Sequence, residues 1–383
     1  MLAFVLVLSV LVFVHEAGHF FAARRAGMRV DEFGFGFPPR LVGVQRVRGR
    51  WRWVTGNKEV DTRTSTIYSL NAVPLGGFVR IAGEDGGKTD DPQSFGSKSY
   101  ARRALVLVAG VAMNLVLSVV LFTVVFVIGA PQVLDGIPPG SQVRDHRVVI
   151  AGILPGGPAA AAGMQAGDVV TAVDAQPVAT ASALQEYVRA HEGVPLELRI
   201  LRGAETKVIS VAAALLPGIG KVGIGVQLTE TGIVRYPVHR AVVEGVRMTG
   251  YVFGEIFRSF AGLFRGLVQE RAVTVEVTGP VGIAVLTGQV VQMGFTHLLQ
   301  FAGVLSANLA LLNVMPFPAL DGGRLALLLL EAVRRKSLRQ TVERAIHTTG
   351  FLVLLALIML VTYRDLTQFG GGIWSAIRSA VGL

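Results

Sequence analysis

Four long apolar stretches divide the chain. They cover residues 1–23, about 104–128, about 297–334 and about 346–362. A helix of about 20 apolar residues crosses the hydrocarbon core of a bilayer. The pattern therefore predicts four transmembrane helices.

The third stretch is too long for one straight span. From His297 to Val333 there are 37 residues, or roughly 55 Å of helix against a core of about 30 Å. Residues 313–323 contain two prolines and two glycines, which cannot continue a regular helix. Irregular backbone at membrane depth is tolerated only where it is buried in protein or lines a cavity. The break therefore predicts a polar cavity inside the bilayer.

Composition supports a membrane protein. Hydrophobic residues make up 51% of the chain, charged residues 16%, and the mean hydropathy is +0.55. Soluble domains carry about 25% charge, so disorder and a wholly soluble globule are excluded. The chain has no cysteine, which excludes disulfides, thiolate zinc sites and cysteine nucleophiles.

The net charge of +10 orients the chain in the membrane. Arginine and lysine gather between the first two apolar stretches and again between the last two, at Arg334, Arg335, Lys336 and Arg339. Positive loops stay in the cytoplasm, so we expect both termini and the long middle segment to lie outside. Because the basic residues adjoin membrane spans, we expect no nucleic-acid partner.

Other segments read as short strands, a soluble insert or surface helices. Residues 33–39, 45–54 and 67–81 read as strands, and basic residues alternate with apolar ones in the second of these. Residues 238–269 predict an amphipathic helix on the outer membrane surface. The C-terminal tail, with residues 373–378, is too short to cross. Between them lies a soluble insert with strands at Val148–Leu154, Val169–Val173, Leu196–Leu201 and Thr206–Ala212, and a helix at Ala181–His191.

A metal-binding pattern lies within the first apolar stretch. His15 and His19 are four residues apart, so on a helix they share one face and can reach one cation. Two histidines without cysteine suit zinc, which lowers the pKa of a bound water for Glu16 to deprotonate. Polar residues in a membrane helix are costly unless they are functional. The alternative is a polar cluster that serves packing or a proton relay.

A third ligand is expected from an acid at similar depth on another span. Asp321 is the only acid in the third stretch before Glu331. His15 lies 9 residues before Arg24, or roughly 13 Å of helix, and Asp321 lies 13 residues before Arg334, or roughly 20 Å. Both segments run from outside to inside, so the depths of His15 and Asp321 in the membrane agree to within the effect of a helix tilt.

Together these motifs resemble the site-2 protease family of intramembrane zinc metalloproteases. The pattern His15–His19 in a first span resembles that family, as does Asn313-x-x-Pro-x-Pro-x-Leu-Asp-Gly in a later one. Residues 156–174 resemble bacterial PDZ domains, and Gly223–Val226 resembles their carboxylate-binding loop. One such domain between spans two and three is similar to the RseP-like branch. Residues 74–79 resemble the family's membrane-reentrant β sheet.

The resemblance also implies roles for individual residues. His15, His19 and Asp321 would bind Zn²⁺, and Glu16 would be the catalytic base. Asn313 and Asn114 would handle substrate, although Asn313 would equally suit a cap on the broken helix. Gly110–Asn114 matches a family motif, except that Val111 stands where proline is usual.

The fold class expected from the sequence and the resemblance is a polytopic α-helical membrane protein. It has four transmembrane segments, a membrane-reentrant β sheet and an inserted α+β PDZ domain. The expected parts are 1–129, with spans one and two and the β region at about 30–85; the extracytoplasmic PDZ-like domain 130–236; the amphipathic helix and linker 237–296; spans three and four in 297–364; and the tail 365–383.

The implied function is hydrolysis of peptide bonds within transmembrane segments of single-span proteins, such as anti-sigma factors or remnant signal peptides. Its partners would be these substrates, the lipid of the bacterial cytoplasmic membrane, and a peptide or protein that the PDZ domain binds. Alternatively, the PDZ domain would bind no ligand and would act only as a steric filter. Two alternatives remain. A metal transporter would use the same ligands, but transporters often have paired broken helices and only the third stretch is broken here. An inactive PDZ scaffold would have no use for Glu16.

Overall fold

The computed structural model describes residues 1–56, 60–63, 65–84, 91–137, 140–203, 205–216, 220–269, 278–336 and 338–381. These residues form two compact units, which are treated separately below. One combines residues 1–123 with 242–383, and the other contains residues 124–241. Residues 270–277 of the predicted linker lie outside the described part of the chain.

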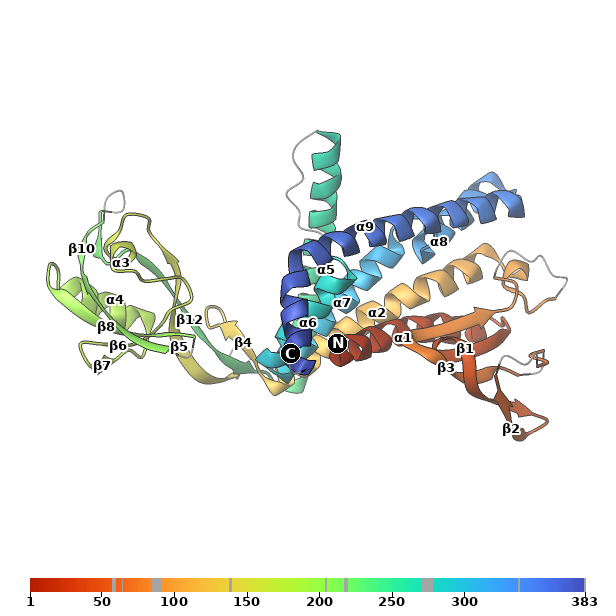
Figure 1. The fold of residues 1–383 in the computed structure, drawn as a ribbon, viewed down its shortest axis with the longest axis horizontal. Coiled ribbons are helices and arrows are strands. Elements are labelled where there is room, and N and C mark those ends of the chain that lie inside the picture. Colours follow the sequence, from red (N-terminus) through yellow and green to blue (C-terminus); the bar gives the residue numbers. More distant parts are fainter. Residues whose placement is uncertain are drawn as a thin grey trace. The chain divides into compact units, whose positions relative to one another are not determined.

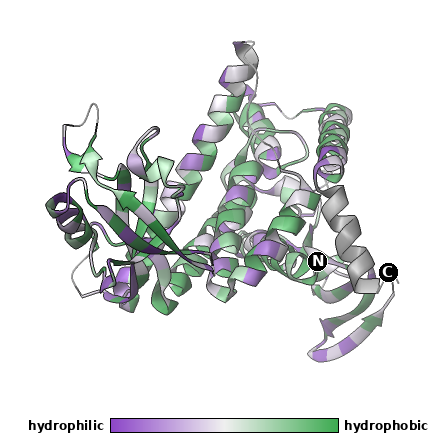
Figure 2. Ribbon diagram, turned by 60° about the vertical axis from the view of Figure 1, so that its left-hand side comes forward, coloured by the Kyte–Doolittle hydropathy of each residue, from purple (hydrophilic) through white to green (hydrophobic). Residues whose placement is uncertain are grey.

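The first unit is built on long apolar helices (Figure 1). Within the described residues, four helices are long and apolar enough to cross a membrane, which confirms the four predicted spans. Figure 2 shows hydrophobic residues, in green, on many turns of the helices. The four are α1 (Leu2–Arg25), α2 (Tyr100–Ile128), α7 (Phe295–Val314) and α9 (Gln340–Val381).

Three further helices complete this unit. Helix α5 (Val238–Val268) corresponds to the predicted amphipathic helix. Helix α6 (Pro280–Met293) was not predicted, because this apolar segment of 14 residues is too short for a span and lacks an amphipathic stripe. Helix α8 (Asp321–Arg334) follows the predicted break. Helix α9 continues to Val381. The described residues of the expected separate tail, 365–381, therefore belong to this last helix.

The break between α7 and α8 depends on glycine. A Cβ atom on Gly322 would lie 2.2 Å from the carbonyl oxygen of Met315, and one on Gly323 would lie 2.2 Å from that of Phe317. Only glycine fits so close to another part of the backbone. The predicted break is therefore confirmed, and it places Asp321 at the first position of a new helix.

A small sheet of β1 (Val30–Val47), β2 (Arg50–Thr55) and β3 (Ile67–Ile81) lies between α1 and α2 in sequence. Strand β3 matches the predicted strand 67–81, and β1 contains the predicted 33–39. The predicted strand 45–54 is wrong in one respect, because a turn at residues 48–49 divides it between β1 and β2. Strand β1 pairs with both ends of β3, since Phe33 lies opposite both Val79 and Tyr68. The pairing puts the strand segments in the order 50–55, 42–47, 67–71, 32–37 and 77–81. Residues 77–81 thus form one edge of the sheet and β2 the other.

Helix α1 holds residues 74–77, where β3 leads into the edge formed by residues 77–81. Ser9, which is buried, donates a hydrogen bond to the carbonyl of Pro74 (2.7 Å) and accepts one from the amide of Gly76 (3.3 Å). Gly76 has φ +84, and a Cβ there would lie 2.5 Å from Val12. The glycines of this segment therefore let the strand pack directly on the helix that carries the two histidines.

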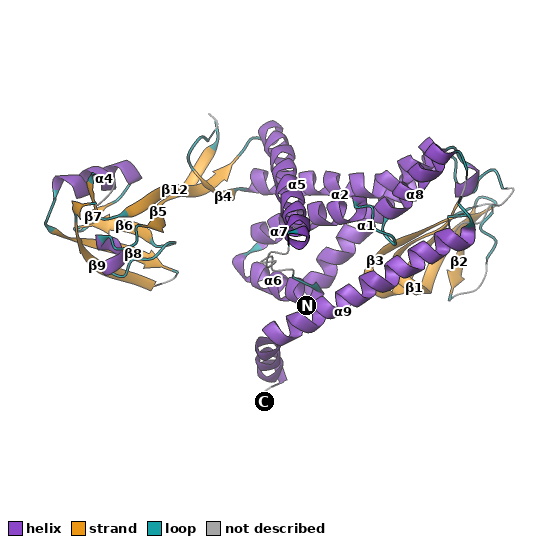
Figure 3. Ribbon diagram, turned by 90° about the horizontal axis from the view of Figure 1, so that it is seen from above, coloured by secondary structure: helices purple, strands orange, loops and turns teal. Residues whose placement is uncertain are grey.

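The second unit is a sheet covered by short helices. Its strands run in the order β4-β12-β5-β6-β8-β9, and β7 pairs with β6. Figure 3 shows these strands as a group distinct from the β1–β3 sheet. The bounds are β4 Ala130–Val133, β5 Gln142–Ile153, β6 Val169–Val173, β7 Gln176–Pro177, β8 Pro195–Arg202, β9 Glu205–Ala212, β10 Ala214–Leu215, β11 Val222–Gly223, β12 Val226–Arg235, α3 Pro158–Ala161 and α4 Ala181–Ala190.

The four strands and the helix predicted for this insert are all present, whereas β4 and β12 were not predicted. Its core contains the fully buried side chains of Ile150, Leu198 and Ile200. A partly buried ion pair joins the end of β8 to the residue before β6: Arg202 donates two hydrogen bonds of 2.7 Å to the carboxylate of Asp168. This guanidinium holds the pKa of Asp168 below its ordinary value.

Candidate metal centre

Two imidazoles from α1 face each other in the interior of the first unit. His15 and His19 are one helical turn apart and both are buried. Their Nε2 atoms lie 3.1 Å from each other. The Nδ1 atom of His19 lies 2.8 Å from the carbonyl oxygen of Val106 on α2. A carbonyl only accepts, so Nδ1 carries the proton and Nε2 is left with a lone pair.

The carboxylate of Asp321 completes this group. Its Oδ2 atom lies 2.9 Å from Nε2 of His15 and 3.1 Å from Nε2 of His19. The break after α7 puts Asp321 at the start of α8, from where it reaches α1. The structure thus brings together three side chains that are separated by 306 residues at most.

The donor set fits one cation. A ligand atom from each of the three residues lies within 4.8 Å of the other two. An imidazole lone pair and a carboxylate oxygen at about 3 Å repel each other unless a positive charge lies between them. Two nitrogens and one carboxylate oxygen are also the donors that zinc takes in catalytic sites with an open fourth position. The residues present therefore fit zinc.

Close approach of α2 to α1 depends on small residues. A Cβ on Gly110 would lie 2.4 Å from Nε2 of His19 and 2.8 Å from Cε1 of His15. A Cβ on Gly18 would lie 2.4 Å from the carbonyl oxygen of Ala109. Small residues let membrane helices pack backbone against backbone. Gly110 also leaves room for both imidazole rings, a role that the sequence did not reveal.

Glu16 points toward the sheet. Its Oε2 accepts a hydrogen bond of 3.1 Å from the amide of Val79 on β3. Val79 belongs to the edge segment 77–81, and this bond shows that its amide faces outward from the sheet. The carboxylate is only partly buried, unlike the two histidines. Glu16 therefore lies between the cluster of His15, His19 and Asp321 and the edge segment 77–81.

Asn114 lies behind His15. It is fully buried, and its Nδ2 is 3.3 Å from Nδ1 of His15. Its Oδ1 has no hydrogen-bond partner. Its backbone carbonyl accepts a bond of 2.7 Å from the hydroxyl of Ser306 on α7. The resemblance implies that Asn114 handles substrate, but the structure places its side chain against His15.

Among the described residues, no hydrogen bond joins the Asn313 side chain to this cluster. Asn313 belongs to the last turn of α7, and its side chain is partly exposed. In the part of the chain that the structure describes, the side-chain amide of Asn313 makes no hydrogen bond. The C-cap of α7 is Met315, so Asn313 is not the residue that caps the broken helix. The geometry thus leaves the Asn313 side chain available beside the break.

Comparison with known proteins identifies the family of this chain. The model of peptidase family M50 matches residues 3–55 and 58–357. A protein of Agrobacterium fabrum named as a zinc metalloprotease is 30% identical over 96% of both chains. Zinc metalloprotease RasP of Geobacillus kaustophilus is 28% identical over 96% of this chain and 98% of its own.

A solved structure resembles part of this chain. The PDZ domain of an SdrC-like protein from Listeria monocytogenes matches 23% of this chain and 92% of its own, with 20% identity and a TM-score of 0.21.

The family match spans nearly the whole chain, in agreement with the order of motifs and the four apolar helices. The chain is therefore a multi-pass membrane protein that belongs to peptidase family M50, the site-2 proteases, and it is a metalloendopeptidase.

Proposed function

We propose that this chain cleaves peptide bonds within the transmembrane segments of single-span proteins, with His15, His19 and Asp321 as ligands of one zinc ion and Glu16 as general base. The observation that carries the proposal is the convergence of Nε2, Nε2 and Oδ2 within 4.8 Å, between helices apolar enough to lie in a membrane. Zinc, when bound, supplies a Lewis acid and activates water at neutral pH.

Glu16 is well placed to move protons. It is next to His15 in sequence, and the amide of Val79 fixes one carboxylate oxygen. The other oxygen is left to accept a proton from the attacking water and to pass it to the leaving amine. Because the side chain is only partly buried, substrate and water can approach it.

The edge segment 77–81 supports a way to hold substrate. A helix in lipid hides its peptide bonds in its own hydrogen bonds, so it must open before cleavage. An opened segment can add to the edge as a further strand, replacing hydrogen bonds that are costly to lose in lipid. Val79 lies in this edge and contacts Glu16, so the added strand would pass the catalytic base. Asn313, beside the break, is proposed to contact the same substrate.

Asn114 is proposed to position His15, since its side chain lies against the ligand instead of an open surface. When Nε2 of His15 binds metal, Nδ1 carries a proton that needs an acceptor. Turning the amide by 180° presents Oδ1, which is otherwise unpartnered, to that proton.

Replacing Asn114 by alanine is expected to weaken zinc affinity by roughly 10- to 100-fold, as for other residues that orient a metal ligand. Competition with a chromogenic chelator measures this. Asn114→Asp, which keeps an acceptor, is expected to restore most of the affinity. Equal affinity in Asn114→Ala and the unmodified protein would show that the contact has no positioning role.

The insert is proposed to be an extracytoplasmic PDZ domain. Strand β4 pairs with residues 231–234 of β12, and the amide of Leu134 bonds the carbonyl of Glu230, so among the described strands residues 226–229 have one open edge. PDZ domains bind an extended peptide along such an edge. Either peptide capture or exclusion of bulky ectodomains would restrict substrates to trimmed proteins. This placement, with both termini outside the bacterial cytoplasmic membrane, suits anti-sigma factors or remnant signal peptides.

The test uses purified full-length protein with a panel of single-span substrates. We expect cleavage within the transmembrane segment, its loss with a zinc chelator, and its recovery on adding zinc. Asp321→Ala should lose both bound zinc and cleavage. Cleavage by a protein shown to be zinc-free would contradict the proposed metal site, and cuts confined to soluble regions would contradict the proposed substrate class.

A further inference from the structure

The hairpin formed by β2 and residues 42–47 of β1 has two different faces. Trp53 lies opposite Val44, and Trp51 lies opposite Arg46, so both indoles are on one face. Directly opposed residues share a face in an antiparallel pair, and neighbours along a strand alternate. Arg50 and Arg52 therefore lie on the other face, and Arg48 lies in the turn.

The charge of this hairpin is uncompensated. Arg46, Arg48, Arg50 and Arg52 fall within seven residues, and residues 41–56 contain no acid. Among the described residues, none of these four guanidinium groups makes an ion pair or a hydrogen bond. By contrast, Arg40 at the base of the sheet pairs with the buried Glu32. The four arginines are thus free to bind anions from outside the protein.

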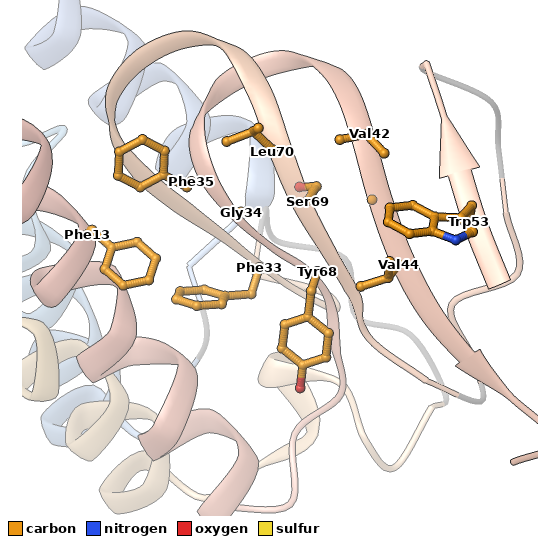
Figure 4. Close-up of a pocket in the computed structure, with 11 residues that line it drawn as sticks. Phe13, Phe33, Gly34, Phe35, Val42, Val44, Trp53, Tyr68, Ser69 and Leu70 are labelled. Atoms are coloured by element: carbon orange, nitrogen blue, oxygen red, sulfur yellow. The ribbon is translucent and has the colours of Figure 1, made fainter. Parts of the chain in front are cut away.

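The two indoles are also exposed, Trp51 by 63% and Trp53 by 71%. Trp53 lies at one end of an apolar groove of about 350 Å³ across the sheet, which ends at Phe13 on α1. Figure 4 shows Val42, Val44 and Trp53 on the side of this groove away from Phe13. The apolar groove therefore runs from helix α1 across the sheet to the hairpin, which carries the exposed tryptophans and arginines.

We propose that residues 42–55 dock on the anionic phospholipid headgroups of the bilayer. Tryptophan prefers the interface between headgroups and acyl chains, where one end of the ring is apolar and the other is wet. Arginine beside it binds phosphate with its planar fork of donors. The charge of these four arginines, which no described acid pairs with, complements an anionic surface. The docked hairpin holds the far edge of the sheet, while residues 77–81 face Glu16.

The inference is tested by fluorescence. The chain has three tryptophans, so Trp374→Phe leaves Trp51 and Trp53 as its only indoles. The full chain is placed in nanodiscs that contain brominated phosphatidylglycerol or brominated phosphatidylcholine at equal mole fraction. We expect bromine to quench the indoles in both, and the anionic lipid to quench roughly twofold or more strongly at low salt. The excess should disappear at about 1 M salt, where the Debye length falls to about 3 Å.

Two variants separate charge from folding. Changing all four arginines to glutamine should remove the excess quenching by anionic lipid, whereas changing them to lysine should keep it. Glutamine at Arg144, Arg147, Arg189 and Arg199 of the insert is the matched control and should keep the excess. Equal quenching by the two lipids in the unmodified hairpin would overturn the proposal. Absence of quenching by either lipid would overturn it as well.

Discussion

Glu16→Gln is expected to abolish peptide hydrolysis while zinc stays bound. Glutamine has nearly the same shape and can still accept the hydrogen bond from the amide of Val79, so the local packing is kept. It cannot take a proton at neutral pH, and a positioned general base contributes roughly 10²- to 10⁴-fold to a rate. Cleavage of a single-span substrate measures the loss, and elemental analysis of the purified variant measures bound zinc.

Glu255→Gln is the matched control. Glu255 lies on α5 and is paired with Arg258 at an exposed position, where ion pairs contribute little. This variant should cleave at the unmodified rate. Glu16→Gln protein that keeps its zinc and cleaves as fast as the control would remove Glu16 from the mechanism. Loss of zinc in Glu16→Gln would instead assign Glu16 to holding the metal.

Gly110→Ala is expected to eliminate both zinc binding and cleavage. The added methyl group would lie 2.4 Å from Nε2 of His19 and 2.8 Å from Cε1 of His15. Neither ring can retreat freely, because Nδ1 of His19 is held by the carbonyl of Val106 and Nδ1 of His15 lies against Asn114. A shift of about 1 Å in a catalytic group can cost roughly 100-fold in rate.

Gly288→Ala provides the comparison. Gly288 also lies in a helix, α6, but no heavy atom lies within 4 Å of the position of its Cβ. Both changes favour the helix by roughly 0.5–1 kcal/mol, so only the contact with the histidines differs. Gly288→Ala should therefore keep zinc and activity. Full zinc occupancy in Gly110→Ala would show that α2 can move away from the ligands.

Much of the fold could be predicted because membrane segments depend on local sequence. A run of apolar residues long enough to cross is visible without knowledge of its neighbours. The prolines and glycines of residues 313–323 likewise mark a break wherever the helix packs. Asp321 could be proposed as the partner of the histidines because few acids occur at that depth.

The remaining details depend on how distant segments meet. Helix α6 is as apolar as a transmembrane helix but shorter, so a search for apolar runs long enough to cross a membrane does not find it. The contact of Val79 with Glu16 requires the register of β3 against β1, which a single sequence does not specify. Asn114 was assigned to substrate by resemblance, and its contact with His15 follows from the close packing of α1 and α2 around Gly110.

The separation of the proposed ligands along the chain has a consequence for biosynthesis. His15 and His19 are in α1, the earliest of the four described spans along the chain, whereas Asp321 follows 306 residues after His15. On the proposed ligand set, the nascent chain has no complete zinc centre while its first two transmembrane helices are being inserted. A protease that opens apolar helices is thereby inert toward these helices during their own insertion.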